Sequence, residues 1–244
     1  MFMRRHLLSL GLAVTGVVAV TACDPITDKT YKDDAALTAK VTAVKLDGIT
    51  SGSVTVTGGT AKASLARTIH YRDKRPDGPT HRVENGVLVL SGCHGISDCS
   101  VSYDIKVPAG LPVTGGTSNG AITLSHVGQV SVTAHSGHIE LKDVSGSVTA
   151  RTSNGRIEGE GLGGPIDVQT SNGAIELTAA KNADVRAKTS NGAITVTVPA
   201  GEHYRVTAHT HNGEPDVGGV PNDPSAQHHL DLTTNNGHIE LLAA

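Results

Sequence analysis

Aromatic residues are nearly missing from this sequence. Of 244 residues none is Trp, four are Tyr and one is Phe, and that single Phe is Phe2 at the N-terminus. Proteins that bind single-stranded nucleic acids stack bases on aromatic rings and line the path with basic residues. This chain has a formal net charge of −3 and no basic block. The composition therefore argues against nucleic-acid binding, and it leaves few aromatic platforms for a sugar.

No apolar run is long or regular enough for an ordinary membrane-spanning helix. The most apolar stretch, Leu7–Val20, is interrupted by Gly and Thr and follows the basic start Arg4–His6. A basic start followed by a short apolar core is typical of an export signal. We therefore expect the N-terminus to be a targeting segment and not part of the folded domain.

The targeting segment ends in a motif with a chemical consequence. Val20–Cys23 reads VTAC, which resembles the bacterial lipobox, although Thr21 stands where Ala or Ser is usual. In that motif the cysteine is lipidated and becomes the first mature residue, and two acyl chains suffice for stable membrane attachment. We expect residues 1–22 to be a lipoprotein signal peptide and Cys23 to carry the lipid. A plain secretory signal cut nearby is the alternative.

Cysteine is scarce. Besides Cys23 the chain has only Cys93 and Cys99, at the ends of the segment CHGISDC. An exported protein meets oxidising conditions, so these two thiols are expected to form a disulfide that fixes a hairpin or a bend. A metal site with His94 and Asp98 as additional ligands is the alternative interpretation.

Helical periodicity is almost absent after the targeting segment. Glycine is abundant, with 29 residues, and Val, Ile and Thr dominate segments in which apolar and polar residues alternate. Alternation with a period of two is typical of strands with one buried face, and frequent glycine marks the turns between them. The sequence therefore predicts an all-β fold.

The most informative feature is a repeat of six residues. TSNGAI occurs at Thr117–Ile122, Thr170–Ile175 and Thr189–Ile194, and the variant TSNGRI occurs at Thr152–Ile157. Aligning further copies on the residue before the turn glycine gives seven anchors: Asn119, Ser136, Asn154, Asn172, Asn191, Asn212 and Asn236. Their spacing of 17 to 24 residues, mostly near 18, indicates a stacked repeat architecture.

Two columns of aliphatic residues repeat with the anchors. Six positions before them stand Val113, Val130, Val148, Ile166, Val185, Val206 and Leu230. Three positions after them stand Ile122, Ile139, Ile157, Ile175, Ile194, Pro215 and Ile239. Each repeat therefore contains two short strands joined at the Asn-Gly turn, where glycine accepts a positive φ without steric cost.

Identical residues at one whole-repeat spacing favour coils that stack in parallel. Each isoleucine would lie on that of the next coil, about 4.8 Å away, and stacked asparagines could hydrogen-bond along the stack. We predict a parallel β-helix, or β-solenoid, with an antiparallel sandwich or a propeller as the alternative. Two earlier segments, Ile49–Gly59 and Val83–Gly92, look like imperfect copies of the repeat.

The predicted organisation has four parts. The signal peptide over residues 1–22 is followed by a polar tether over residues 23–39. An N-terminal β region with the disulfide loop covers residues 40–112, and the β-solenoid repeats continue from it over residues 113–244.

The same register stacks charged side chains on the outer faces. Glu140, Glu158 and Glu176 would form an acidic ladder, in which like charges lie one strand spacing apart and repel one another. On the other strand, Arg151 and Lys188 would lie in a polar to basic ladder. Such ladders could bind cations, a basic polymer or an anionic wall polymer, or they could be solvated faces that keep the protein soluble.

Other chemical motifs are weak. His209 and His211 would lie on one side of a strand, but no Cys or carboxylate at a recognisable spacing completes a zinc site, so no metal or cofactor is expected. Gly116–Gly120 matches the G-x-S-x-G pattern of hydrolases, but its serine recurs as part of the repeat and no helix follows it. We expect no catalytic residues. A carbohydrate-active enzyme that pairs glutamates on a β-helix is the alternative.

One longer pattern resembles a known family. The segment SDCSVSYDIKVPAGLPV at Ser97–Val113, followed by serial TSNGxI repeats, resembles the bacterial β-strand-repeat family described as "putative adhesins", which includes exported lipoproteins of actinobacteria. The resemblance covers roughly residues 40–244. It implies an extracytoplasmic β-solenoid-like domain and transfers no catalytic residue.

These features together predict a surface-exposed, membrane-anchored lipoprotein that is not an enzyme. We expect it to act as an adhesin-like binding module or a scaffold through its polar ladders. The expected partners are the membrane, through the lipid anchor, and an envelope protein or a cell-wall polymer. An accessory role in an envelope-sensing system is a further alternative.

Overall fold

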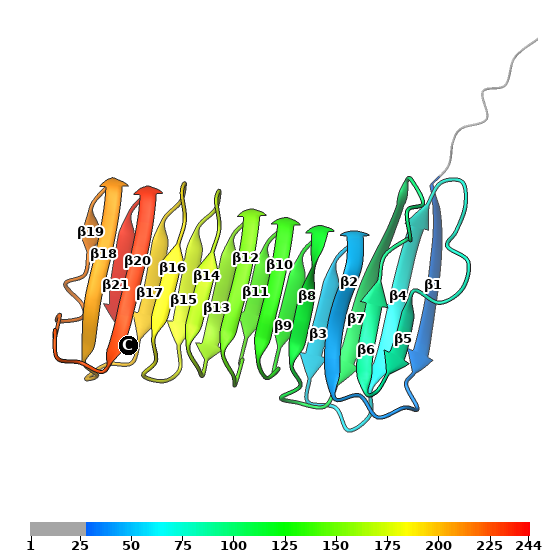
Figure 1. Cartoon of the computed structure of the whole chain (residues 1–244), viewed down its shortest axis with the longest axis horizontal. Helices are drawn as coiled ribbons and strands as arrows, with labels where there is room; N and C mark the ends of the chain where they lie inside the picture. The colour runs from blue at the N-terminus through cyan, green and yellow to red at the C-terminus, as the bar shows by residue number, and fades with distance from the viewer. Residues whose placement is uncertain (1–27) are drawn as a thin grey trace, which may run out of the picture.

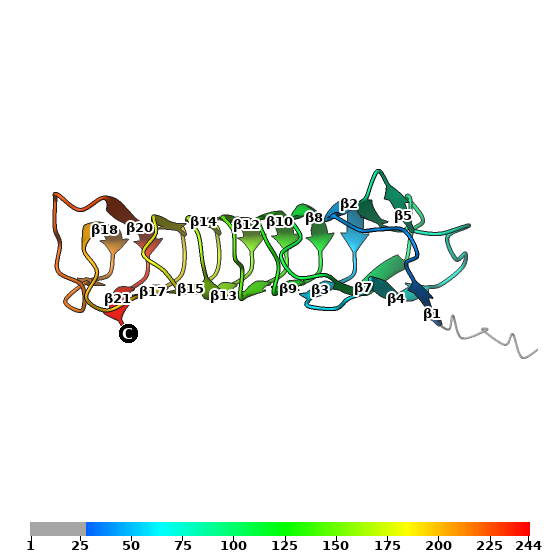
Figure 2. The same ribbon diagram turned by 90° about the horizontal axis from the view of Figure 1, so that it is seen from below.

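The computed structural model describes residues 28–244. All regular secondary structure in that part of the chain consists of β-strands. The expected signal peptide and Cys23 lie outside the described residues. The strands form two long sheets, here called sheet A and sheet B, that face each other across a thin apolar interior (Figures 1 and 2).

Sheet A contains, in spatial order, β1 (Lys29–Ala36), β4 (Ser64–Tyr71), β7 (Cys99–Val107), β3 (Val54–Gly58), β9 (Ile122–Ser125), β11 (Ile139–Lys142), β13 (Ile157–Leu162), β15 (Ile175–Ala179), β17 (Ile194–Val198), β21 (Ile239–Ala243) and β19 (Pro215–Asp216). Sheet B contains β5 (His81–Glu84), β6 (Val87–Ser91), β2 (Ala43–Ser51), β8 (Val113–Asn119), β10 (Val130–Ser136), β12 (Val148–Asn154), β14 (Ile166–Gln169), β16 (Val185–Lys188), β20 (His228–Asn236) and β18 (Tyr204–Asn212).

Each coil contributes one strand to each sheet. The chain runs along sheet B, turns at Asn-Gly and returns along sheet A, and neighbouring coils pair in parallel. Val130 pairs with Val148 in sheet B, Ile157 pairs with Ile175 in sheet A, and none of the four is more than 1% exposed. The predicted parallel β-solenoid is confirmed, and the two aliphatic columns form its interior.

The threonine of the repeat is buried at the edge where the chain crosses between the sheets. Its Oγ1 donates a hydrogen bond to the glycine carbonyl of the preceding coil, as Thr170 does to Gly155 (2.9 Å) and Thr189 does to Gly173 (3.0 Å). A buried hydroxyl needs such a partner. The repeat therefore keeps a threonine at a position where a valine would fit by size alone.

The asparagines form a continuous ladder along the same edge. Each Nδ2 donates to the Oδ1 of the previous asparagine in the stack over 2.7 to 3.0 Å. The order of the ladder is Asn154, Asn172, Asn191, Asn236 and Asn212. The predicted stacking of asparagines is confirmed, and because all the amides point the same way, each bond polarises the next.

The turn glycine is required by close packing between coils. A Cβ atom at Gly173 would lie 2.0 Å from the carbonyl oxygen of Gly155, and one at Gly192 would lie 2.0 Å from that of Gly173. No side chain fits at that distance. The explanation by positive φ alone is therefore incomplete, because contact with the neighbouring coil excludes every other residue.

One inner coil departs from the aliphatic pattern. Gly159 stands where the neighbouring strands have Leu141 and Leu177, and the pairing of β13 with β15 shifts between Gly159 and Leu162. Leu162 is fully buried, and a Cβ at Gly159 would lie 2.7 Å from its Cδ1. The bulge therefore brings a leucine from further along the strand into the space that glycine leaves.

The last two coils stack in the reverse of their sequence order. β20 pairs with β16 on one side and with β18 on the other, and β21 lies between β17 and β19 (Figure 1). The expectation that each coil lies on the next one in sequence is wrong here, because Ile239 and not Pro215 lies on Ile194. Proline has no N–H for an interior ladder, so its coil occupies the end of the stack.

The N-terminal end shows the same inversion. β2 and β3 lie between the coil of β6 and β7 and the coil of β8 and β9, so Ile49–Gly59 is a coil turn as expected. The expectation for Val83–Gly92 is wrong, because Asn85 and Gly86 close an antiparallel hairpin between β5 and β6. Both residues have positive φ (51° and 82°), the backbone conformation that tight hairpin turns prefer.

Part of the segment expected as a tether forms a strand. β1 pairs antiparallel with β4 along its whole length, from Lys29 opposite Tyr71 to Ala36 opposite Ser64. The sequence of β1 is mostly polar, so hydrophobic burial contributes little to holding it in place.

A polar cluster fastens β1 to the end of the stack. Arg67 is only 7% exposed, donates from Nε to Oδ1 of Asp33 (2.8 Å), and donates from Nη1 to Oγ1 of Thr80 (2.9 Å). The Tyr103 hydroxyl donates to the carbonyl of Ser91 (2.6 Å). The hydrogen bond from Arg67 lowers the pKa of Asp33, and burial raises the pKa of Tyr103 to about 12.

Candidate functional site

The acidic ladder predicted from the sequence is in register. Glu140 on β11 pairs with Glu158 on β13, which pairs with Glu176 on β15. The column continues toward the C-terminal end of the stack through Thr195, Glu240 and Asp216. The outward column of sheet A is therefore acidic over most of its C-terminal half.

The acidic ladder lies in a shallow groove on the outer face of sheet A. The groove has a volume of about 590 Å³, and its lining comes from five neighbouring strands, β11, β13, β15, β17 and β21. Besides the ladder, its polar lining includes Lys142, Glu160, Thr178, Thr197 and Glu240. A linear ligand lying in this groove would cross the strands and meet one coil about every 4.8 Å.

Arg156 neutralises part of the acidic ladder. Its Nε lies 2.8 Å from Oε1 of Glu158, and its guanidinium also pairs with Glu176. The hydrogen bond with Glu176 raises the pKa of Arg156. Glu140 has no ion pair within residues 28–244, so one end of the acidic ladder carries an uncompensated charge.

The ladder on sheet B has a different character. Arg151 and Lys188 flank Gln169 in one column across β12, β14 and β16, as the register predicts. Arg151 pairs with Asp167 (Nη2 to Oδ2, 3.0 Å), whereas Lys188 makes no ion pair with any described residue. The basic ladder is therefore reduced to one uncompensated cation.

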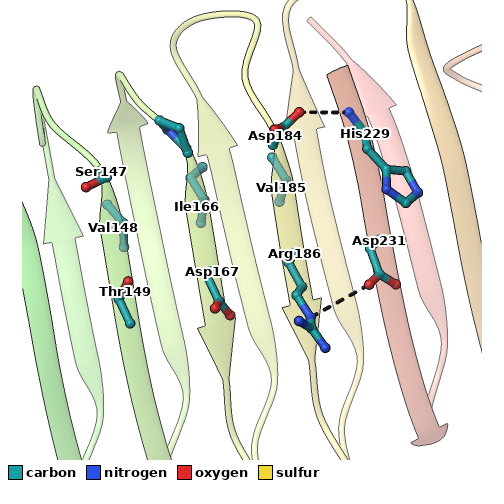
Figure 3. A pocket seen from close by; sticks show the side chains of 11 residues that line it. Ser147, Val148, Thr149, Ile166, Asp167, Asp184, Val185, Arg186, His229 and Asp231 are labelled. Carbon is teal, nitrogen blue, oxygen red and sulfur yellow. Dashed lines mark hydrogen bonds and ion pairs between the residues drawn. The ribbon is translucent and has the colours of Figure 1, made fainter. Parts of the chain in front are cut away.

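A second groove crosses sheet B, and sequence reasoning missed it. It has a volume of about 430 Å³, and acidic and basic side chains lie side by side in it (Figure 3). Asp167, Arg186 and Asp231 occupy adjacent strands, and Nε of Arg186 lies 3.7 Å from Oδ2 of Asp231. The available signal was the column five residues before the anchors, where Asp167, Arg186 and Asp231 carry charges, although Thr207 separates the last two in the sequence.

Asp184 connects two strands at the rim of this second groove. Its Oδ1 accepts the backbone N–H of His229 (2.9 Å) and lies 3.3 Å from Nδ1 of His228. The backbone hydrogen bond from His229 is the main cause that lowers the pKa of Asp184. Because the polar groups of this groove largely satisfy one another, its charges are less available to a ligand than the acidic ladder.

The expected disulfide is present between Cys93 and Cys99. Cys93 is 2% exposed and follows β6, and Cys99 begins β7. The bond closes the loop that carries the chain from sheet B to sheet A at the N-terminal end. Lipidation of Cys23 falls outside the described residues and stays a prediction.

The histidines at the C-terminal end of sheet B fall into two pairs that lie apart along the strands, because His209 is opposite Thr233 and His229 is opposite Arg205. His209 and His211 are on β18, and His228 and His229 begin β20. Within residues 28–244, no group of three or more His, Cys, Asp or Glu side chains is arranged to hold a metal ion. In the same part of the chain, no helix has the length and apolarity needed to cross a membrane.

Stacked parallel coils with flat polar outer faces define this protein as a two-sheet β-solenoid. Residues 95–242, more than half of the chain, match the family described as Toastrack DUF4097, and the chain belongs to this family. The resemblance drawn from the VPAG segment and the TSNG repeats is confirmed.

Solved structures are only distantly similar to the chain. A Bacteroides fragilis protein described as a "putative adhesin" is 14% identical, covers 89% of this chain and 99% of its own, and has a TM-score of 0.49. A "putative cell adhesion protein" of Clostridium sporogenes is 13% identical, covers 88% and 100%, and has a TM-score of 0.38. A "putative adhesin" of Parabacteroides distasonis is 14% identical, covers 87% and 97%, and has a TM-score of 0.39. No curated protein matches the chain.

Proposed function

We propose that this protein is an extracytoplasmic lipoprotein, anchored to the membrane through Cys23, that binds a basic partner along the acidic ladder. The VTAC motif supports the anchor. The disulfide between Cys93 and Cys99 supports the compartment, because disulfides persist under oxidising conditions. The partner is a basic segment of an envelope protein or an amine-bearing wall polymer.

The observation that carries the proposal is the in-register stack of Glu140, Glu158 and Glu176 in a groove. Like charges directly opposite each other on paired strands are destabilising. Arg156 relieves this repulsion at two of the three glutamates, and Glu140 is left without a cation among the described residues. Cationic groups of a bound partner would relieve the remainder.

Binding of this kind depends on repetition. A single exposed ion pair contributes little, typically below about 1 kcal/mol, and the side chains of Glu158 and Glu176 are 42% and 49% exposed. A linear partner with one cation per coil gains several such contacts without further loss of translational freedom. The proposed binding is therefore cumulative, and it weakens as the salt concentration rises.

The proposed role is binding or scaffolding without turnover. Each glutamate of the acidic ladder comes from a separate coil and points out of a flat sheet. Glycosidases instead hold one carboxyl in an apolar site that raises its pKa while a second stays ionised nearby. The ladder on sheet B is the weaker binding candidate, because Arg151 is already paired with Asp167, which leaves Lys188 as its one cation without an ion pair among residues 28–244.

A pull-down tests the proposed partner. The full chain in detergent is the bait, and solubilised envelope proteins and isolated wall polymers are offered in parallel. Changing Glu140, Glu158 and Glu176 together to Gln is expected to weaken capture about tenfold, since three weak ion pairs are lost. The matched control changes three exposed acids outside the groove, Asp34, Asp73 and Glu214, to their amides and should retain capture.

The outcomes separate the two halves of the proposal. Equal capture by both triple variants would exclude the acidic ladder as the binding surface, and so would capture that is insensitive to salt. The anchor is tested by fractionation, where Cys23→Ala is expected to release the protein from the membrane fraction. Retention of that variant in the membrane would exclude lipidation at Cys23 as the attachment.

A further inference from the structure

The two sheets end differently at the C-terminal end of the stack. Sheet A ends at β19, which has two residues, and Pro215 has no N–H to offer a further strand. Sheet B ends at β18, which has nine residues and none of the prolines or lysines that commonly protect an edge. A strand edge with free N–H and C=O groups is a template for another strand.

The chain covers only the beginning of this edge. Oδ1 of Asn222 accepts the N–H of Val206 (2.9 Å), and the N–H of Asp223 donates to the carbonyl of Tyr204 (2.9 Å). Alternate residues of a parallel strand direct their backbone groups to the same side, so Ala208 and Thr210 direct theirs to this open side as well. In the region that the structure describes, neither residue has a partner there.

The asparagine edge of the outermost coil is also incomplete. In inner coils the turn glycine donates its N–H to the asparagine carbonyl of the next coil, as Gly155 does to Asn172 (3.0 Å). Gly213 lies at the end of the stack, and no coil within residues 28–244 follows it to accept its N–H. The asparagine ladder likewise ends at Asn212, whose Nδ2 donates to Asn236 while no described residue donates to its Oδ1.

We propose that the open edge of β18, from Val206 to Gly213, binds one extended peptide strand in parallel, and that this strand carries the pattern Thr-x-Asn-Gly. The peptide threonine donates to the carbonyl of Gly213, as Thr210 does to Gly237 (3.0 Å). The peptide asparagine donates its Nδ2 to Oδ1 of Asn212 and accepts the N–H of Gly213. The partner is thus an unpaired segment of the same repeat chemistry as this chain.

Steric contacts sharpen the specificity. Along the inner stack a Cβ on the turn glycine would lie 2.0 to 2.2 Å from the glycine carbonyl of the preceding coil. The peptide residue that lies over Gly213 must therefore be glycine too. Pro215 closes sheet A, so the site accepts a single strand and does not accept another whole coil.

The inward side of the edge also favours such a strand. Val206, Ala208 and Thr210 face the interior but are only half-buried, whereas the equivalent Val185 and Ala187 of β16 are at most 1% exposed. A small or β-branched side chain on the added strand would complete their burial, as the next coil does elsewhere.

The probe is a labelled peptide with the sequence IDVQTSNGAI, which copies Ile166–Ile175. Binding to the full chain in detergent is followed by fluorescence anisotropy, and saturable binding is expected. The peptide with Ala in place of its Gly should bind about tenfold more weakly or worse, because it cannot approach the edge. Equal binding of both peptides would overturn the proposal.

A protein variant tests the location of the site. Ala208→Pro removes an N–H that the fold does not use, and edge strands tolerate proline at such positions. It should weaken peptide binding about tenfold, while the matched variant Ala208→Val retains the N–H and should bind like the parent protein. Unchanged binding by Ala208→Pro would overturn the proposal.

Amide hydrogen exchange on the unmodified protein gives a readout that does not depend on any variant folding. Peptide binding should slow exchange at Ala208, Thr210 and Gly213. Slowing confined to the β1 or β5 edge would overturn the assignment. Concentration-dependent dimerisation that protects the same three amides without peptide would also overturn the proposal, because a folded second copy would then occupy the edge in place of an unpaired strand.

Discussion

The inner coils and the end coils use the same strands under different constraints. An inner coil has a neighbour on each side, so its threonine, asparagine, glycine and isoleucine each make a contact that the next copy must reproduce. An end coil has one neighbour, and it departs from the repeat: Pro215 replaces isoleucine, and β5 and β6 form a hairpin. Having two neighbours therefore favours the regular repeat, and the largest departures from it occur in the end coils, although inner coils tolerate local ones such as Ser136 and Gly159.

The largest expected effect comes from placing a charge in an inner coil. Ile175→Asp buries a carboxylate between two fully buried isoleucines and should destabilise the domain by about 4 kcal/mol or more. Val206→Asp at the half-buried end should cost only about 1–2 kcal/mol, because water reaches the carboxylate. Chemical denaturation followed by circular dichroism measures both.

Glu158→Gln is the control for these two variants. It changes an outward side chain of the same inner region and should alter the free energy of unfolding by less than about 0.5 kcal/mol. Similar losses for Ile175→Asp and Val206→Asp would contradict the difference between inner and end coils.

The turn glycine gives a second, smaller contrast. Gly173→Ala places a Cβ 2.0 Å from the carbonyl of Gly155, and coils on both sides resist the shift that would relieve the overlap. A loss of about 2–3 kcal/mol is expected. Gly213→Ala makes an equally close contact with Gly237, at 2.1 Å, but its coil can move outward, so about 1 kcal/mol is expected. Thermal unfolding of the two variants under the same conditions compares the two losses, and equal losses would contradict the difference between inner and end coils.

Acid release of β1 from the N-terminal end is expected to be a small effect, comparable with that of Gly213→Ala. Arg67 lowers the folded-state pKa of Asp33 below its unfolded value of about 3.9. The stabilisation from this ion pair is therefore fully present above pH 3.9 and is lost as the pH falls through the lower folded-state pKa. About 1 kcal/mol is expected, since the Asp33 side chain is 30% exposed.

Amide exchange measured between pH 5 and pH 2.5 checks this release. After correction for the intrinsic pH dependence of exchange, β1 should lose protection while β15 keeps it. Asp33→Asn should abolish the difference between the two pH values in β1. Loss of protection in β15 at the same pH would mean that acid unfolds the whole stack.

The interior of the stack could be predicted from the sequence because its periodicity is strict. Aliphatic residues such as Val148 and Ile157 recur at fixed distances from each Asn-Gly. This spacing predicts the strand register of both sheets, and with it the outward column of Glu140, Glu158 and Glu176. The bulge at Gly159 could not be predicted, because only the three-dimensional spacing shows that Leu162 reaches its place.

The order of the end coils could not be predicted with the same reasoning. A repeat pattern states which residues are equivalent, but not which coil lies on which. Pro215 was the available signal, since an interior ladder strand needs its N–H. The role of Asn85-Gly86 is ambiguous in the sequence for a related reason, because the same dipeptide suits a coil turn and a hairpin. The strand β1 could not be predicted because its sequence is polar, and a partly buried ion pair between Asp33 and Arg67 holds it in place.

The length of the stack can change by whole coils when one repeat is gained or lost from the sequence. Val148 and Ile166 occupy equivalent positions in adjacent coils, so residues 148–165 form one complete circuit of the chain. Removing that circuit would rejoin equivalent backbone positions, shorten the stack by one strand spacing of about 4.8 Å and leave both ends as they are. Duplication or loss of such a unit can therefore set the distance between the two ends of the stack, and the sequences of the end coils need not change.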